Sequence, residues 1–225
     1  MKIDIWSDVV CPWCYLGAVR FDAAMEQLPF RDELDIRWRA YQLDPEAPRE
    51  PQDLRATLER KYGPGAFDTM TTRLTQLGEN EGIDYRFDLT QRVNTFDAHR
   101  LVAFANALQH GQHGQHDDPT AKAPNPRNIV NRLFRAYFTE GENLADQDRL
   151  VQIAAGEGME PTAVAEMLAG DSFTDVVTHD IDQARGFGLS GVPAFVVEER
   201  WLISGAQEVD TIVDALTGMH DQLVH

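Results

Sequence analysis

The chain has 225 residues, of which 43% are hydrophobic and 25% are charged, as in ordinary globular proteins with one large domain or two closely joined ones. Its formal net charge of −17 argues against nucleic acids and anionic membrane surfaces as partners, because their phosphate groups select Lys and Arg. No apolar run approaches the roughly 18 residues that a membrane-spanning helix needs.

The N-terminal part of the chain predicts a strand, a helix and a second strand. Met1 leads directly into a mostly apolar run at 3–6, which suits a buried strand, and residues 15–28 have a helical apolar spacing that ends at Pro29. Residues 34–40 alternate apolar and charged side chains with period two, as a half-buried strand does. Because no basic and apolar leader precedes the first strand, we expect a cytoplasmic protein.

The middle of the chain, from residue 51 to about residue 170, is mainly helical in pattern. Breaks at Gly, Pro or Asx residues separate its apolar repeats. The predicted helices span 51–62, 65–78, 95–109, 127–139, 146–156 and 161–169. Residues 83–88 suit an extended segment, and residues 110–128, which are poor in apolar side chains, predict a surface loop.

The C-terminal part returns to alternating helices and strands. Ser172 is a suitable N-cap for a helix that ends at Gly186, and apolar runs at 194–197 and 201–203 predict two strands joined by a turn. Apolar residues at helical spacing from Val209 onward predict a final helix. The order strand–helix–strand, helical block, helix–strand–strand–helix places the chain in the α/β class.

The only two cysteines, Cys11 and Cys14, flank Pro12 and Trp13 between the first strand and the first helix. The N-terminus of that helix offers free N–H groups and the positive end of its dipole to the first sulfur, which favours the reactive thiolate. Pro12 stiffens the turn, and Trp13 supplies apolar surface beside the sulfur. The spacing therefore favours thiol–disulfide exchange, in which Cys11 attacks a substrate disulfide and Cys14 resolves the mixed disulfide.

Three other uses of the cysteine pair compete with this interpretation. A structural zinc needs four ligands, and the chain has no second cysteine pair to supply them. A structural disulfide across so short a loop would remove little entropy from the unfolded chain. Two buried, inert thiols are the third alternative, but a Pro-Trp pair at a helix start is not typical of core packing.

The order of elements resembles a thioredoxin fold interrupted by an inserted all-helical domain, as in the DsbA-like family of oxidoreductases. The stretches similar to the FrnE-like branch of that family are Ser7–Tyr15, Asn94–Arg100 and Ser204–Gln207. The resemblance implies a thioredoxin-like domain of residues 1–45 and 171–225, with an inserted helical domain of residues 46–170.

The resemblance also implies a substrate-binding segment at Val192 and Pro193. In thioredoxin folds the corresponding proline is cis and lies beside the cysteines, where the preceding residue exposes backbone that an extended peptide can pair with. From the residues alone, a trans proline that opens a strand is the alternative. Asn94 has two interpretations: its side chain overhangs the active site, or Asn94 or Thr95 is the N-cap of the helix that follows.

Asp8, three residues before Cys11, suits either proton transfer to Cys14 or a plain role as a solvated turn or capping residue. His99 and Arg100 lie on one predicted helix. His99 either faces the active-site cleft or is a surface histidine that needs no further explanation.

Three histidines, His110, His113 and His116, recur at every third position in a Gly- and Gln-rich stretch. Imidazole is a good metal ligand, but a flexible loop offers no preorganised geometry and no supporting contacts. We therefore expect a solvated loop and no metal site.

The favoured function is that of a dithiol–disulfide oxidoreductase acting on protein or small-molecule thiols and disulfides. It needs no cofactor beyond its own redox-active pair, with glutathione as a candidate co-substrate. The resemblance keeps open a glutathione-dependent isomerase or transferase of the kappa-class or 2-hydroxychromene-2-carboxylate isomerase type. In those relatives a serine usually occupies the first cysteine position, so two cysteines favour redox chemistry. A metal-sequestering binding module is the third hypothesis, but its further ligands are not evident.

Overall fold

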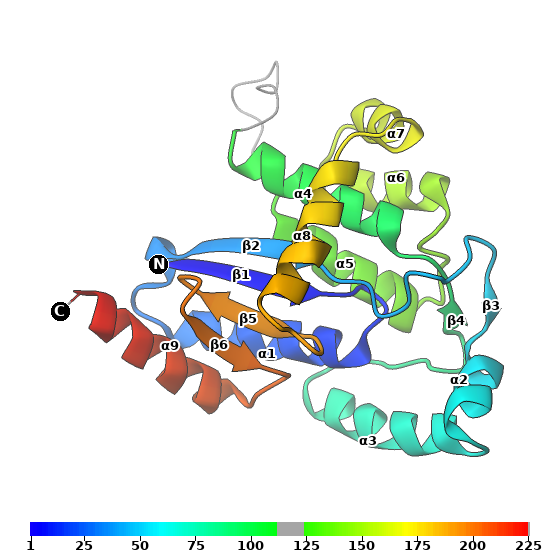
Figure 1. The fold of residues 1–225 in the computed structure, drawn as a ribbon, viewed down its shortest axis with the longest axis horizontal. Coiled ribbons are helices and arrows are strands. Elements are labelled where there is room, and N and C mark those ends of the chain that lie inside the picture. The colour runs from blue at the N-terminus through cyan, green and yellow to red at the C-terminus, as the bar shows by residue number, and fades with distance from the viewer. Residues whose placement is uncertain (112–123, 225) are drawn as a thin grey trace.

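The computed structural model describes residues 1–111 and 124–224, and its centre is a four-stranded mixed sheet in the order β2-β1-β5-β6 (Figure 1). The strands are β1 (Lys2–Ser7), β2 (Asp35–Ala40), β5 (Ala194–Val197) and β6 (Trp201–Ser204). β1 pairs in parallel with β2 and antiparallel with β5, which pairs antiparallel with β6. The N-terminal and C-terminal parts of the chain thus meet in one sheet.

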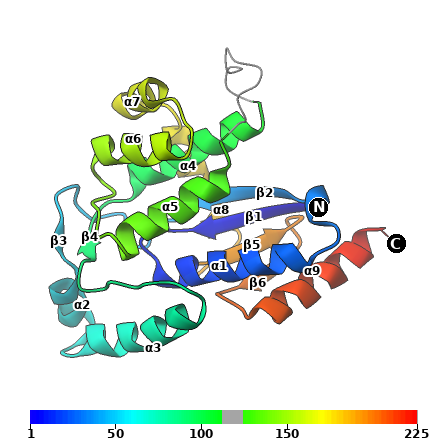
Figure 2. The same cartoon turned by 180° about the vertical axis from the view of Figure 1, so that it is seen from behind.

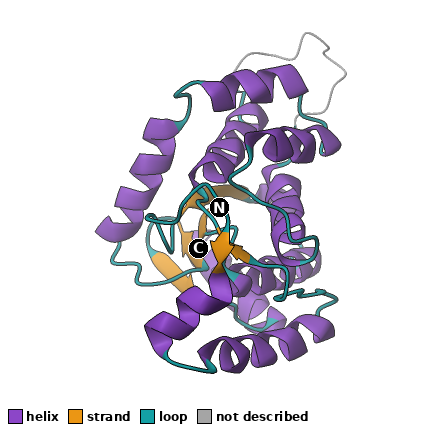
Figure 3. Ribbon diagram, turned by 90° about the vertical axis from the view of Figure 1, so that its right-hand side faces the viewer, coloured by secondary structure: helices purple, strands orange, loops and turns teal. Residues whose placement is uncertain are grey.

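Helices cover both faces of this sheet, and Figure 3 shows the strands in the middle of the molecule with helices around them. On one face α1 (Pro12–Gln27) and α9 (Val209–Val224) lie side by side, and on the other lies α8 (Thr174–Gly186), as Figures 1 and 2 show from opposite sides. The pleat of β1 divides its side chains accordingly, because neighbours in a strand point to opposite faces. Ile3 and Ile5 belong to the core with α1, whereas Trp6 packs with Ala184 of α8.

The chain between β2 and α8 is helical. Its helices are α2 (Leu54–Tyr62), α3 (Ala66–Asn80), α4 (Phe96–Gln109), α5 (Pro126–Phe138), α6 (Gln147–Gly156) and α7 (Pro161–Ala169). It also contains a short β-ladder, β3 (Gln52–Asp53) with β4 (Gln91–Arg92), and a 3₁₀ turn η1 at Arg31–Glu33 precedes β2. Leu133 and Phe134 of α5 are fully buried in the same apolar cluster as Ile5 of β1, so the helical segment and the sheet share one core.

The predicted α/β fold with a helical insert is confirmed, and most predicted helices agree within three residues at each end. The segment 83–88, predicted as extended, forms no strand; the short pairing lies just after it, at β4. Ser172 is not an N-cap, because α8 begins at Thr174 after Phe173, whose φ is 64°. α2 begins later than predicted, because the Asp53 carboxylate caps it by accepting the N–H of Ala56.

Candidate active site

The two cysteines lie where β1 leads into α1. Cys11 is the N-cap residue of α1, its carbonyl accepts the N–H groups of Cys14 and Tyr15 at 3.0 and 3.2 Å, and Pro12 occupies the first helical turn. Both are free thiols, 4% and 1% exposed, whereas Trp13 between them is 38% exposed. The turn therefore presents the indole to solvent and leaves Cys11 the more accessible of two largely covered sulfurs.

The segment before β5 completes the site. The Val192–Pro193 peptide bond is cis, as predicted, and the Cys11 thiol lies 3.7 Å from the Val192 carbonyl oxygen, to which it donates. The Pro193 carbonyl accepts the N–H of Gly205 at 2.8 Å. A Cβ at Gly17 would lie 2.8 Å from Pro193 Cγ, so only a glycine lets α1 approach this closely.

Asp8 is 1% exposed, so it is not a solvated turn residue, and its carbonyl accepts the N–H of Cys11 at 2.9 Å. One carboxylate oxygen accepts the N–H of Leu43 at 2.8 Å, and the other lies 3.3 Å from Nε2 of His99. His99, on α4, is itself 4% exposed and therefore points inward. The buried Asp8–His99 contact joins the active-site turn to the helical segment.

Cys14 is held as a thiol by its surroundings. Burial, together with the hydrogen bond and charge of neighbouring Cys11, raises the pKa of Cys14 well above its ordinary value. The backbone N–H of Asp8 and the hydroxyl of Ser7 act in the opposite direction, because both favour the thiolate. The second cysteine of the pair is thus a protonated thiol.

Tyr85, between α3 and α4, also supports the turn. Its hydroxyl donates to the Pro12 carbonyl oxygen at 2.6 Å, and its ring stacks on Phe87 with the centroids 4.9 Å apart. Burial and the charges of the nearby thiols raise the pKa of Tyr85, which keeps the hydroxyl a donor. Sequence reasoning did not identify Tyr85, since no local pattern connects it with Pro12.

Asn94 and Arg100 have structural contacts. Asn94 Oδ1 accepts the N–H of Phe96 at the start of α4, and its amide donates to the Ala47 carbonyl at 3.0 Å. Thr95 is the N-cap residue of α4, and Asn94, one residue earlier, binds the first N–H of the helix. Arg100 is 4% exposed and pairs with Asp97. Its guanidinium donates to carbonyl oxygens at and after the end of α7, those of Met167, Leu168, Gly170 and Ser172.

The histidine stretch lies mostly outside the described residues, which include His110 but neither His113 nor His116. His110 contacts Asp35 through Nε2 at 2.8 Å and the Asn106 carbonyl through Nδ1 at 2.7 Å. Within residues 1–111 and 124–224, no three His, Cys, Asp or Glu side chains are grouped to hold a metal ion. In the same residues, no helix is long and apolar enough to cross a membrane.

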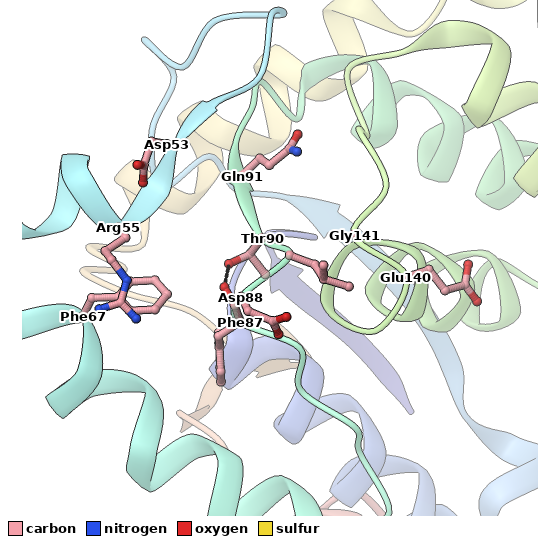
Figure 4. A pocket seen from close by; sticks show the side chains of 10 residues that line it. Asp53, Arg55, Phe67, Phe87, Asp88, Thr90, Gln91, Glu140 and Gly141 are labelled. Atoms are coloured by element: carbon pink, nitrogen blue, oxygen red, sulfur yellow. Dashed lines mark hydrogen bonds between the residues drawn. The ribbon is translucent and has the colours of Figure 1, made fainter.

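A cavity of about 430 Å³ lies apart from the cysteines, between β3, α3 and the segment that leads into β4 (Figure 4). Arg55 borders it, stacked 4.3 Å from the Phe67 ring centroid and paired with Asp68 and Glu59. Neither cysteine nor Pro193 lines it. Because its one cation is already neutralised and the reactive groups lie elsewhere, we place the candidate active site at the cysteines.

Comparison with known proteins agrees with the fold. The profile of the DSBA-like thioredoxin domain family matches residues 2–217. The structure of a probable DsbA oxidoreductase from Streptomyces coelicolor is 31% identical, with a TM-score of 0.82, covering 97% of this chain and 89% of that one. The chain therefore belongs to the DSBA-like thioredoxin domain family.

Two more distant structures share the fold. The cytosolic disulfide reductase DsbM from Pseudomonas aeruginosa is 19% identical, with a TM-score of 0.69 over 99% of this chain and 100% of that one. The structure of a 2-hydroxychromene-2-carboxylate isomerase is 16% identical, with a TM-score of 0.68 over 100% of this chain and 98% of that one. The fold thus occurs with two different reactions.

Proposed function

We propose that this member of the DSBA-like thioredoxin domain family reduces or exchanges disulfides of proteins or small thiols in the cytoplasm, and that it belongs to the FrnE-like branch. The observation that carries the proposal is the pair of free thiols at the start of α1, of which Cys11 lies beside Val192 and Cys14 is buried. The motif stretches noted in the sequence support the branch. The name of the cytosolic disulfide reductase with the same fold supports the compartment and the direction of electron flow.

The mechanism follows from the different surroundings of the two sulfurs. Cys11 Sγ, at the N-terminus of α1, attacks one sulfur of the substrate disulfide, and the other substrate sulfur leaves as a thiolate that takes up a proton. Cys14 then loses its proton and attacks Cys11 Sγ, which releases the second substrate thiol. The substrate disulfide gains two electrons, and the Cys11–Cys14 pair becomes a disulfide.

The backbone around Val192 is the proposed docking segment for the substrate. Its carbonyl already accepts a hydrogen bond from Cys11, so a peptide paired there would have its disulfide beside the attacking sulfur. The exposed Trp13 side chain gives the substrate an apolar surface, and the guanidinium of Arg73 lies 6.0 Å from its ring centroid.

The second candidate is the glutathione-dependent isomerase reaction, favoured by the fold shared with 2-hydroxychromene-2-carboxylate isomerase. Replacing Cys11 with Ser separates the two. If the protein is an oxidoreductase, the Cys11→Ser variant loses turnover of insulin or glutathione disulfide completely, because a hydroxyl cannot carry the mixed disulfide. The control Cys14→Ser should still form a mixed disulfide at Cys11 but not release it. Isomerase activity that survives in Cys11→Ser would overturn the proposal.

A further inference from the structure

Ser7 is the last residue of β1 and is 5% exposed. Side chains alternate between the faces of a strand, so Ser7 points to the same face as Ile3 and Ile5. Those two residues pack in the core that contains Cys14 and the buried face of α1, whereas Trp6 packs toward α8. The Ser7 hydroxyl is therefore directed into the apolar layer beneath the active-site turn.

Among the described residues, the Ser7 hydroxyl is one of the few buried side-chain groups with no hydrogen-bond partner. Leaving a buried hydroxyl unpaired costs folding free energy, so such a group calls for an explanation. The Cys14 thiol supplies that explanation. The Ser7 hydroxyl lies on the face of β1 that packs in the same core as Cys14, and it makes no hydrogen bond to the neutral Cys14 thiol. Its effect on the Cys14 thiol is to lower the pKa, which favours the ionised sulfur.

We propose that Ser7 is a catalytic residue of the resolving step, in which its hydroxyl and the Asp8 backbone N–H both donate to the Cys14 thiolate. This inference rests on the proposed function. Cys14 gives up its proton, its sulfur attacks Cys11 Sγ in the mixed disulfide, the bond from Cys11 to the substrate breaks, and the departing substrate thiolate takes up a proton. The Ser7 hydroxyl forms this hydrogen bond only while Cys14 is a thiolate.

The attack by Cys11 does not depend on this contact. Cys11 Sγ interacts with the Val192 carbonyl and lies at the start of the helix, on the substrate side of the turn. Loss of the Ser7 hydroxyl should therefore slow the second step and leave the first unchanged. It should also leave stability unchanged or raised, since an unpaired buried hydroxyl disappears.

Mixing the reduced protein with an equimolar amount of Ellman's reagent separates the two steps. The first equivalent of thionitrobenzoate reports attack by Cys11, and the second reports displacement by Cys14. In Ser7→Ala we expect the first phase within about twofold of wild type and the second slowed about tenfold or more, as for a lost hydrogen bond to a charged group. Ser7→Thr, which keeps the hydroxyl, should restore the second phase.

Thr90→Val is the matched control for stability. The Thr90 hydroxyl is also buried but donates to the Phe87 carbonyl at 2.9 Å, so its loss should lower the melting temperature, whereas Ser7→Ala should not. An unchanged second phase in Ser7→Ala would overturn the assignment. So would equal slowing of both phases, or a fall in melting temperature like that of Thr90→Val. A wild-type protein that releases only one equivalent would instead refute the proposed function.

Discussion

Replacing Gly17 with Ala tests whether the contact between α1 and Pro193 controls the site. The new methyl group would lie 2.8 Å from Pro193 Cγ and 3.5 Å from the Cα and Cβ atoms of Ala206. Carbon atoms in good contact are about 3.5–4.0 Å apart, so Pro193 must move. Overpacking of this kind costs roughly 1–3 kcal/mol, and the better helix propensity of Ala returns about 1 kcal/mol. The net loss of stability is thus about 0–2 kcal/mol.

Gly218→Ala is the control, because Gly218 lies within α9 and has no atom within 4 Å of a built Cβ. Urea unfolding should show it stabilised by about 0.5–1 kcal/mol. Gly17→Ala should be the less stable variant by about 1–3 kcal/mol and should turn over disulfides more slowly, because Val192 moves away from Cys11. The reasoning is refuted if Gly17→Ala gains as much stability as Gly218→Ala and keeps wild-type turnover.

Two further predictions concern stability. Arg100→Met should cost about 3–5 kcal/mol in urea unfolding, because the carbonyls of Met167 and Gly170 lose their guanidinium donor. The buried Asp97 carboxylate would keep only Gln147 and the exposed Arg49 as partners. A cost below about 1 kcal/mol would contradict this role. The raised pKa of Cys14 means that the folded state holds this proton more tightly than the unfolded state. The contribution of this proton to the free energy of unfolding is fully present below the unfolded-state pKa of about 8.5. It is lost as pH rises above that value, by up to about 1.4 kcal/mol per pH unit. Reduced wild type should thus lose more stability than Cys14→Ala between about pH 8.5 and 9.5, and parallel curves would contradict the assignment.

Local patterns predicted the elements of this fold well where one face of an element meets a core. The alternation at 34–40 corresponds to β2, and the helical spacing after Pro161 corresponds to α7. The errors occur where distant residues decide the conformation. Residues 83–88 have strand-like composition but form no strand, because their polar groups bond to distant helices: the Arg86 N–H donates to the Phe138 carbonyl at the end of α5, and the Tyr85 hydroxyl donates to the Pro12 carbonyl of α1. Ser172 does not cap α8; its carbonyl accepts a hydrogen bond from Arg100, 72 residues away.

The active site likewise contains some residues that local sequence patterns indicate and others that they do not. The cysteine pair and Pro193 are visible as motifs, and a glycine inside α1 is a local signal too, because it weakens a helix by about 1 kcal/mol unless a neighbour needs the space. No local pattern could show that His99 meets Asp8, because 91 residues separate them. Ser7 was visible only as part of a motif, since the lack of a partner for its hydroxyl depends on the packing around it.

The reaction class depends on position 14 and its surroundings, because a shared fold does not determine the reaction. Structures named as a disulfide reductase and as an isomerase are about equally similar to this chain. A glutathione-dependent isomerase needs one activated group, at position 11, and has no step in which Cys14 would ionise. Yet Ser7 and the Asp8 N–H favour its thiolate, and the Ser7 hydroxyl has no hydrogen-bond partner among the described residues. The proposed role of Ser7 therefore favours the oxidoreductase over the isomerase, because only the oxidoreductase has a step in which Cys14 attacks.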